Sequence, residues 1–128
     1  MLEHVSLEEI EAIFESMPVE VSFIDVNEKV RYFNKGMNRI FPRHASVIGK
    51  DVRNCHPEKS LDKVLTIIND FKTGKRNKAE FWIDLKGMKV HIRYFPVKDK
   101  NGKYLGTLEV SQDIAPIQAI QGEKRLLD

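Results

Sequence analysis

The sequence predicts an α+β domain, in which helices pack on one face of a five-stranded antiparallel sheet, preceded by an amphipathic N-terminal helix. Two observations lead to this fold class. One strongly periodic helix, between residues 55 and 74, separates two strand-like segments from three others. The last three strand-like segments are joined by tight turns, which connect antiparallel neighbours. At 128 residues, the chain has the length of one domain.

The central helix carries an apolar stripe whose members recur every three or four residues and therefore share one helical face. These are Leu61, Val64, Leu65, Ile68 and Phe71. Pro57 suits the first helical position, and Gly74 suits the position just past the end of the helix. Asp62 and Asp70 lie off the stripe, so we expect both to face water.

The other elements follow from local patterns. A capping-box sequence, Ser6–Glu9, predicts an N-terminal helix whose apolar face must cover the sheet or a partner subunit. The polar residues 34–49 predict short helical turns, because Pro42 and glycines interrupt any longer pattern. Strands are predicted at Val19–Val26, Val30–Phe33, Ala79–Leu85, Met88–Val97 and Tyr104–Asp113. We divide the chain into an N-terminal helix (1–17), a sheet domain (18–115) and a C-terminal connector or helix (116–128).

Composition argues against several classes of function. A net charge of +2 gives no electrostatic case for nucleic acid, and no apolar run approaches the roughly 20 residues that span a bilayer. The single cysteine cannot form an internal disulfide and fits a reducing compartment, so we expect a cytoplasmic protein. No nucleophile–base set and no glycine-rich phosphate loop appears, so we expect no enzyme.

The order of the elements and several short motifs resemble the PAS sensory domain over residues 18–115. The matching residues are Asp25, Asn34, Ile48-Gly49, Asp99–Gly102, Gly106 and Asp113–Ala115. A second set resembles one subgroup of PAS modules, found at the C-terminal end of proteins that also carry a DUF438 segment and a hemerythrin-like domain. This set comprises Phe41–Arg43, Cys55–Ser60, Ala79–Trp82, Ile92–Tyr94, Leu108–Val110, Gln112-Asp113 and Gly122–Leu127. The resemblance implies signal transduction within a longer parent protein.

The resemblance also implies that a small ligand or cofactor binds between the central helix and the sheet. Candidate cofactor-binding residues are Arg43, Cys55, His56, Leu65, Ile68, Arg93 and Gln112. Haem is the leading candidate cofactor, with His56 as its metal ligand, because a neutral imidazole can bind haem iron. Flavin is disfavoured, because His-Pro-Glu-Lys follows Cys55 where the flavin-binding branch has Arg-Phe-Leu-Gln.

Each candidate also has a structural interpretation. His56 could fix the start of the helix by a hydrogen bond, and Cys55 could be a small buried hydrophobe. Arg43 or Arg93 could clamp a ligand carboxylate, pair internally with Glu109, or lie on the outer face of the sheet. The strands carry apolar residues at both parities, so the inward-facing side chains cannot be assigned from the sequence.

We therefore expect a sensor or interaction module that binds a small ligand or a partner. It would form a homodimer and relay a conformational change through its terminal helices. The alternatives are a haem-binding gas or redox sensor and a purely structural dimerisation module without a ligand.

Overall fold

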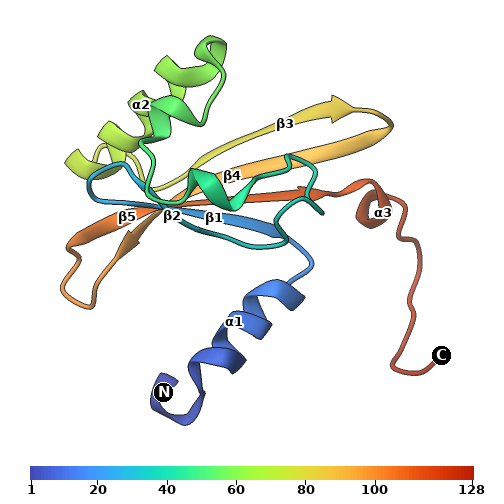
Figure 1. Cartoon of the computed structure of the whole chain (residues 1–128). Coiled ribbons are helices and arrows are strands. Elements are labelled where there is room, and N and C mark those ends of the chain that lie inside the picture. Colours follow the sequence, from blue (N-terminus) through green and yellow to red (C-terminus); the bar gives the residue numbers. More distant parts are fainter.

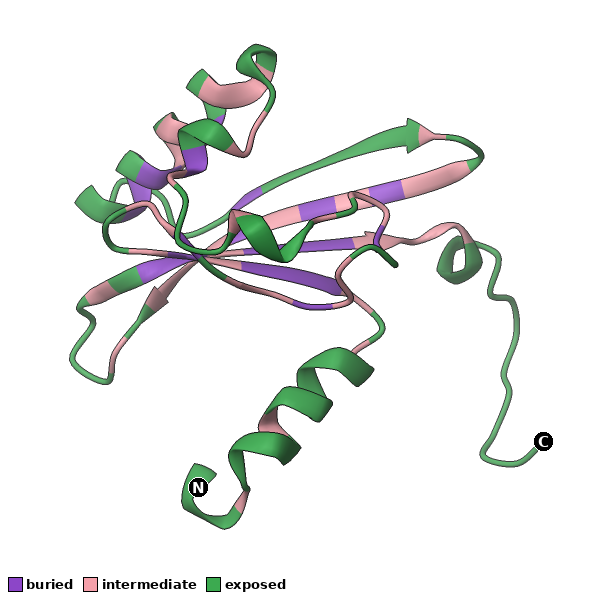
Figure 2. Cartoon of the chain, in the orientation of Figure 1, coloured by how far each residue is buried: buried purple, intermediate pink, exposed green.

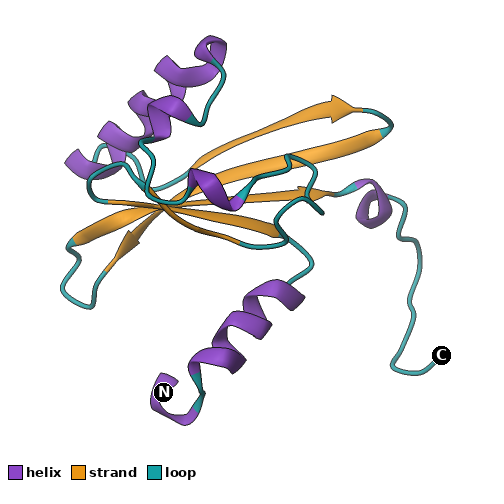
Figure 3. Cartoon of the chain, viewed as in Figure 1, coloured by secondary structure: helices purple, strands orange, loops and turns teal.

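Five antiparallel strands form one sheet in the order β2-β1-β5-β4-β3, which confirms the predicted α+β class (Figures 1 and 3). The computed structural model describes residues 1–128. Its strands are β1 (Glu20–Asp25), β2 (Val30–Phe33), β3 (Ala79–Leu85), β4 (Met88–Lys98) and β5 (Tyr104–Asp113). The chain leaves β2 at one edge of the sheet and returns at β3 on the opposite edge.

Helix α2 (Glu58–Thr73) lies over one face of the sheet and buries Val64, Ile68 and Phe71 (Figures 1 and 2). Pro57 precedes the helix, and Gly74 ends it in the left-handed conformation, with φ of 75°. The expectation for Asp70 was wrong. Its side chain is buried because the chain turns back after the helix and places Arg76 Nε 3.1 Å from the Asp70 carboxylate.

The face of the sheet beneath α2, here called the inner face, carries the core in two clusters. One contains Phe71, Ala79, Val90, Ile92 and Tyr94, and the other contains Ile24, Val52, Val64 and Ile68. Side chains alternate between the two faces along each strand. The buried Ile92 and Tyr94 therefore assign Arg93 to the outer face of β4. This alternation resolves the parity that the sequence leaves ambiguous.

The terminal helices are much less buried than α2. Helix α1 (Leu7–Ser16) has the predicted capping box between Ser6 and Glu9, and none of its residues is buried (Figure 2). Leu7 and Ile13 on its apolar side are 82% and 52% exposed. Helix α3 (Ala115–Gln118) is a single turn, and the tail beyond it is exposed. No helix in this chain combines the length and the apolar character needed to cross a membrane.

The chain enters and leaves the sheet at adjacent positions, because Glu20 at the start of β1 pairs with Ser111 near the end of β5. At the other end of this strand pair, Gly106 pairs with Asp25. A Cβ atom added at Gly106 would lie 2.3 Å from the Ile24 carbonyl oxygen and 2.7 Å from the Phe23 ring. Gly106 is therefore required by the close approach of the two central strands.

We expect Gly106→Ala to lower the free energy of unfolding by about 3 kcal/mol, because a backbone carbonyl blocks the new methyl group. Gly74→Ala is the matched control, since it sits in the left-handed conformation with nothing within 4 Å of the added Cβ. At Gly74, the strain of the left-handed backbone alone should lower the free energy of unfolding by about 1–2 kcal/mol. Urea unfolding of both variants measures the difference, and equal losses would refute the steric explanation.

Candidate functional site

A cavity of about 740 Å³ lies between α2, the segment Phe41–Arg43 and the inner face of the sheet. Its walls are mostly apolar and come from elements far apart in the sequence. They include Phe41, Pro57, Val64, Ile67, Phe81 and Ile92. The polar lining comes from Arg43, Cys55, His56, Ser60, Lys63, Tyr94 and Glu109. The central helix therefore forms one wall of this cavity.

Glu109 of β5 is the acidic group of this cavity, and its side chain is only 7% exposed. Arg43 Nη2 lies 3.8 Å from one carboxylate oxygen, and His56 Nε2 lies 3.9 Å from the other. Both distances are too long for a direct hydrogen bond, but the Arg43 guanidinium is close enough for strong electrostatic attraction to the carboxylate. The predicted internal ion pair between Arg43 and Glu109 is thus confirmed.

Burial and polar contacts have opposite effects on the ionisation of Glu109. Burial raises the pKa of Glu109, but contacts with His56 and Tyr94 and the charge of Arg43 outweigh it and hold the pKa below its ordinary value. Burial, reinforced by the charge of Glu109, raises the pKa of Tyr94 far above its ordinary value. The cavity therefore contains an ionised carboxylate beside a protonated phenol.

Arg43, His56, Tyr94 and Glu109 form a polar cluster in the cavity, and two of its atoms lack hydrogen-bond partners. Arg43 Nε and His56 Nδ1 are both buried and make no hydrogen bond within the protein. Buried polar groups are almost always paired, so such atoms indicate a place where a ligand or water completes the structure. The cluster has unused hydrogen-bonding capacity next to an apolar space.

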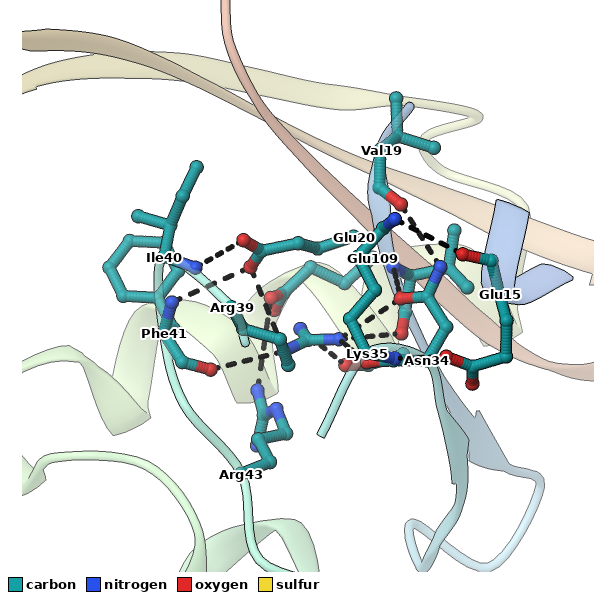
Figure 4. A network of polar contacts seen from close by, with 12 residues as sticks. Glu15, Val19, Glu20, Asn34, Lys35, Arg39, Ile40, Phe41, Arg43 and Glu109 are labelled. Atoms are coloured by element: carbon teal, nitrogen blue, oxygen red, sulfur yellow. Dashed lines mark hydrogen bonds and ion pairs between the residues drawn. The ribbon is translucent and has the colours of Figure 1, made fainter. Parts of the chain in front are cut away.

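A second polar network holds the cavity wall in place (Figure 4). The Arg39 side chain, which has no exposed surface, donates to the carbonyl oxygens of Phe41, Val21 and Asn34 at 3.0–3.1 Å. Its guanidinium also lies 3.6 Å from Glu20, whose carboxylate accepts from the backbone of Ile40. Buried hydrogen bonds to Arg39 and Glu20 therefore hold the part of the chain that carries Phe41 and Arg43.

Asn34 connects this network to the N-terminal helix. Its side-chain oxygen accepts a 2.8 Å hydrogen bond from the Val21 backbone, and its nitrogen donates to Phe14 at 2.8 Å and to Val19 at 3.0 Å. The end of α1 is also held by Glu15, which accepts a 2.9 Å hydrogen bond from the Lys35 backbone. One buried amide thus touches both the helix and the sheet.

The structure brings together three of the seven predicted cofactor-binding residues, because Arg43, Cys55 and His56 all line the cavity. Ile68 is in the core, and Leu65 packs against that core without lining the cavity. Arg93 pairs with Val110 and Gln112 pairs with His91, which places both on the outer face. A ligand-binding role for any of these residues stays a prediction.

Sequence reasoning did not assign Glu109 or Tyr94 to a binding site, although it considered Glu109 as an ion-pair partner. It missed Arg39 and Glu20 entirely. An arginine within an irregular, polar segment looks like a solvated loop residue. The only residue of this polar network that the sequence singled out was Asn34, which is part of the family resemblance.

The haem prediction for His56 stays untested. A metal-bound histidine usually presents one nitrogen to the metal while the other donates to a protein acceptor. Here Nε2 lies 3.9 Å from a Glu109 oxygen, and Nδ1 is buried and makes no hydrogen bond within the protein. No group of three or more His, Cys, Asp or Glu side chains is arranged to hold a metal ion.

Comparisons with known proteins agree on the family. A sequence model of the PAS domain family matches residues 10–115. The C-terminal domain of a Streptococcus mutans protein is 31% identical, with a TM-score of 0.85 and 91% of each chain covered. The PAS domain of Bordetella pertussis BvgS is 17% identical, with a TM-score of 0.63, covering 85% of this chain and 86% of that one.

A sensory box sensor histidine kinase from Vibrio cholerae shares the fold at 11% identity. Its TM-score is 0.59, and the match covers 83% of this chain and 90% of that one. A comparison with curated protein sequences found no match.

We expect the free energy of unfolding to depend less on pH, at acid pH, in Glu109→Gln than in the wild type. The lowered pKa means that ionised Glu109 stabilises the folded state above its ordinary pKa of about 4.3, and that this contribution disappears as the pH falls through the folded pKa. Between about pH 5 and pH 3, the free energy of unfolding should fall more steeply in the wild type than in Glu109→Gln.

Urea unfolding at a series of pH values measures this slope. Glu11→Gln is the control, because Glu11 is an exposed carboxylate on α1 and should leave the wild-type slope unchanged. Parallel profiles for Glu109→Gln and the wild type would show that Glu109 has the same pKa in the folded and unfolded states.

Proposed function

Because the chain belongs to the PAS domain family, whose members are sensor domains of signalling proteins, we propose that it is a sensor module that binds a small molecule beneath α2. PAS domains are typically sensory or interaction modules rather than enzymes. Binding would change how the cavity wall packs, and the terminal helices would carry that change to other parts of a signalling protein.

The cavity is the observation that carries this proposal. Small-molecule sites are concave, mostly apolar and contain a few convergent polar groups, with volumes of about 300–1,000 Å³. The space beneath α2 has this character, with a volume of about 740 Å³ and an acid–base cluster at Glu109. Its two unpartnered buried nitrogens, on Arg43 and His56, support binding rather than a filled core.

The polar network supplies a physical route from the cavity to α1. The wall residue Phe41 is fixed by Arg39, Arg39 is bonded to Asn34, and Asn34 holds the last turn of α1. A ligand that favours one position of the Phe41–Arg43 segment would therefore bias the contacts of Asn34. The effect is a shift between pre-existing populations, with a size set by the difference in ligand affinity for the two states.

Helix α1 is suited to respond because little holds it to the sheet. It buries no residue, and its attachment consists of polar bonds at its C-terminal end and a contact between the Phe14 and Tyr32 rings, with centroids 5.7 Å apart. Elements with few buried apolar contacts open at low free energy. A small change at Asn34 can therefore produce a measurable change in the exposure of α1.

The setting of the module is also part of the proposal. The Streptococcus mutans relative is itself a C-terminal domain, which supports a place within a longer protein. The resemblance to DUF438-associated PAS modules favours a signalling parent of that type. The single cysteine, which is free, favours a reducing compartment such as the cytosol.

A covalent label at Cys55 tests the relay without knowledge of the natural ligand. Cys55 is the only cysteine and lines the cavity, so benzyl methanethiosulfonate would attach one aromatic ring there. We expect the label to change the hydrogen exchange of α1 amides by at least about fivefold, the lower end of typical coupling between sites. Asn34→Asp should abolish this response, because it removes both donors to Phe14 and Val19 but keeps the oxygens that face Val21 and Arg39.

Three controls make the result interpretable. Asn38→Asp, at an exposed position, should respond like the wild type, and Cys55→Ser should not respond to the reagent. Circular dichroism establishes that each variant is folded. An equal response in Asn34→Asp would disprove the Asn34 route, and no response in the wild type would favour a purely structural module.

We also propose that the protein forms a homodimer through α1. Its apolar side is uncovered, and a shallow groove along it is lined by Val5, Ala12, Ile13 and Met17. An amphipathic helix normally buries its apolar side, and a second copy of the chain would supply the missing cover.

We expect Ile13→Glu to weaken dimerisation at least about tenfold, because it places a charge within the apolar contact. Ile120→Glu introduces the same charge at a tail residue that is 71% exposed and should leave dimerisation unchanged. Sedimentation velocity over a range of concentrations measures both. A monomeric wild type, or dissociation caused by Ile120→Glu alone, would overturn the proposal.

A further inference from the structure

The polar cluster at Glu109 constrains the kind of molecule that the cavity can hold. We propose that the cavity selects an uncharged, flat ring compound carrying an N–H or O–H donor beside an acceptor, of which an aromatic amide is the simplest example. This inference rests on the proposed function, because it assumes that a small molecule binds beneath α2. Three features of the site lead to it.

The first feature is charge balance. Arg43 and Glu109 are oppositely charged, and their side chains are only 13% and 7% exposed. A charged ligand placed beside them would add an unpaired buried charge, which is unfavourable in an apolar cavity. Lys63 also lines the cavity, but it is exposed, so water already solvates its charge. The buried part of the site therefore favours a neutral ligand.

The second feature is unused hydrogen-bonding capacity of both kinds. Arg43 and His56 stay 3.8 and 3.9 Å from the Glu109 oxygens, so the carboxylate can still accept a hydrogen bond from a ligand. Arg43 Nε is a buried donor without an acceptor. A ligand that donates to Glu109 and accepts from Arg43 would satisfy both groups. An amide presents these two functions side by side.

The third feature is the shape of the apolar walls. The rings of Phe81 and Tyr94 are stacked, with centroids 6.0 Å apart and planes inclined by 22°. Phe41 and Pro42 line the cavity from the segment opposite the sheet. Flat side chains on two sides favour a planar, apolar body, and aromatic rings gain additional stabilisation from stacked or edge contacts.

Four compounds that share one ring test the proposal. Benzamide is neutral with a donor and an acceptor, benzoate is an anion, benzylammonium is a cation, and toluene has no polar group. Titrations followed by ¹H–¹⁵N correlation spectra of the whole chain at pH 7 give the four affinities. We expect benzamide to bind at least about tenfold more tightly than each of the others, because two hydrogen bonds to the cluster distinguish it.

Glu109→Gln provides the sharper test. Removal of the carboxylate leaves the Arg43 charge unbalanced, so benzoate should overtake benzamide in this variant. Glu80→Gln is the matched control, because Glu80 pairs with Arg93 across the strands and therefore lies on the outer face. The wild-type order of affinities should be unchanged in Glu80→Gln.

The outcomes separate this inference from the function on which it rests. Tightest binding of benzoate or of benzylammonium to the wild type would overturn the neutral-ligand inference and leave the sensor proposal standing. Equal binding of all four compounds would show that apolar contact alone determines selection, which also overturns it. If none of the four perturbs the signals of cavity residues, the ligand-sensing function itself is rejected.

Discussion

The buried guanidinium of Arg39 is the interaction on which the cavity depends. The segment between β2 and α2 has no strand or long helix of its own, so its backbone needs hydrogen-bond partners from elsewhere. Arg39 meets this need by donating to the Asn34 and Phe41 carbonyls within the segment, and to the Val21 carbonyl and Ser22 hydroxyl of β1. Together with the bonds from Arg43 N–H to the Gly36 carbonyl and from Ile40 N–H to Glu20, it fixes Phe41 and Arg43 opposite the sheet.

Two glutamates on the inner face make the arrangement possible and also limit it. Glu20 of β1 faces Arg39, and Glu109 of β5 faces Arg43. Replacing such buried ion pairs by well-packed apolar residues is often neutral or stabilising, so their presence is not explained by stability alone. An apolar inner face at these positions would allow the Phe41–Arg43 segment to collapse onto the sheet. The ion pairs are compatible with an open cavity.

The parts of this structure that depend on local signals could be predicted, and those that depend on distant contacts could not. The apolar stripe of α2, Gly74 at its end and the turns between β3, β4 and β5 are all encoded by nearby residues, and each lies where the pattern indicated. Asp70 was misassigned because helical periodicity carries no information about Arg76 beyond the end of the helix. Arg43 and Arg93 look equivalent in the sequence, but the register of β4 against β5 places Arg93 on the outer face, whereas Arg43 lies near Glu109 on the inner face.

The pairing of Glu20 with Ser111 places the segments before β1 and after β5 at the same end of two neighbouring central strands. Polypeptide attached at either side would thus emerge from almost one point of the sheet. A change in the twist between β1 and β5 would rotate the segments that flank these strands relative to each other. Such a twist would change the mutual orientation of the two flanking segments more than their separation.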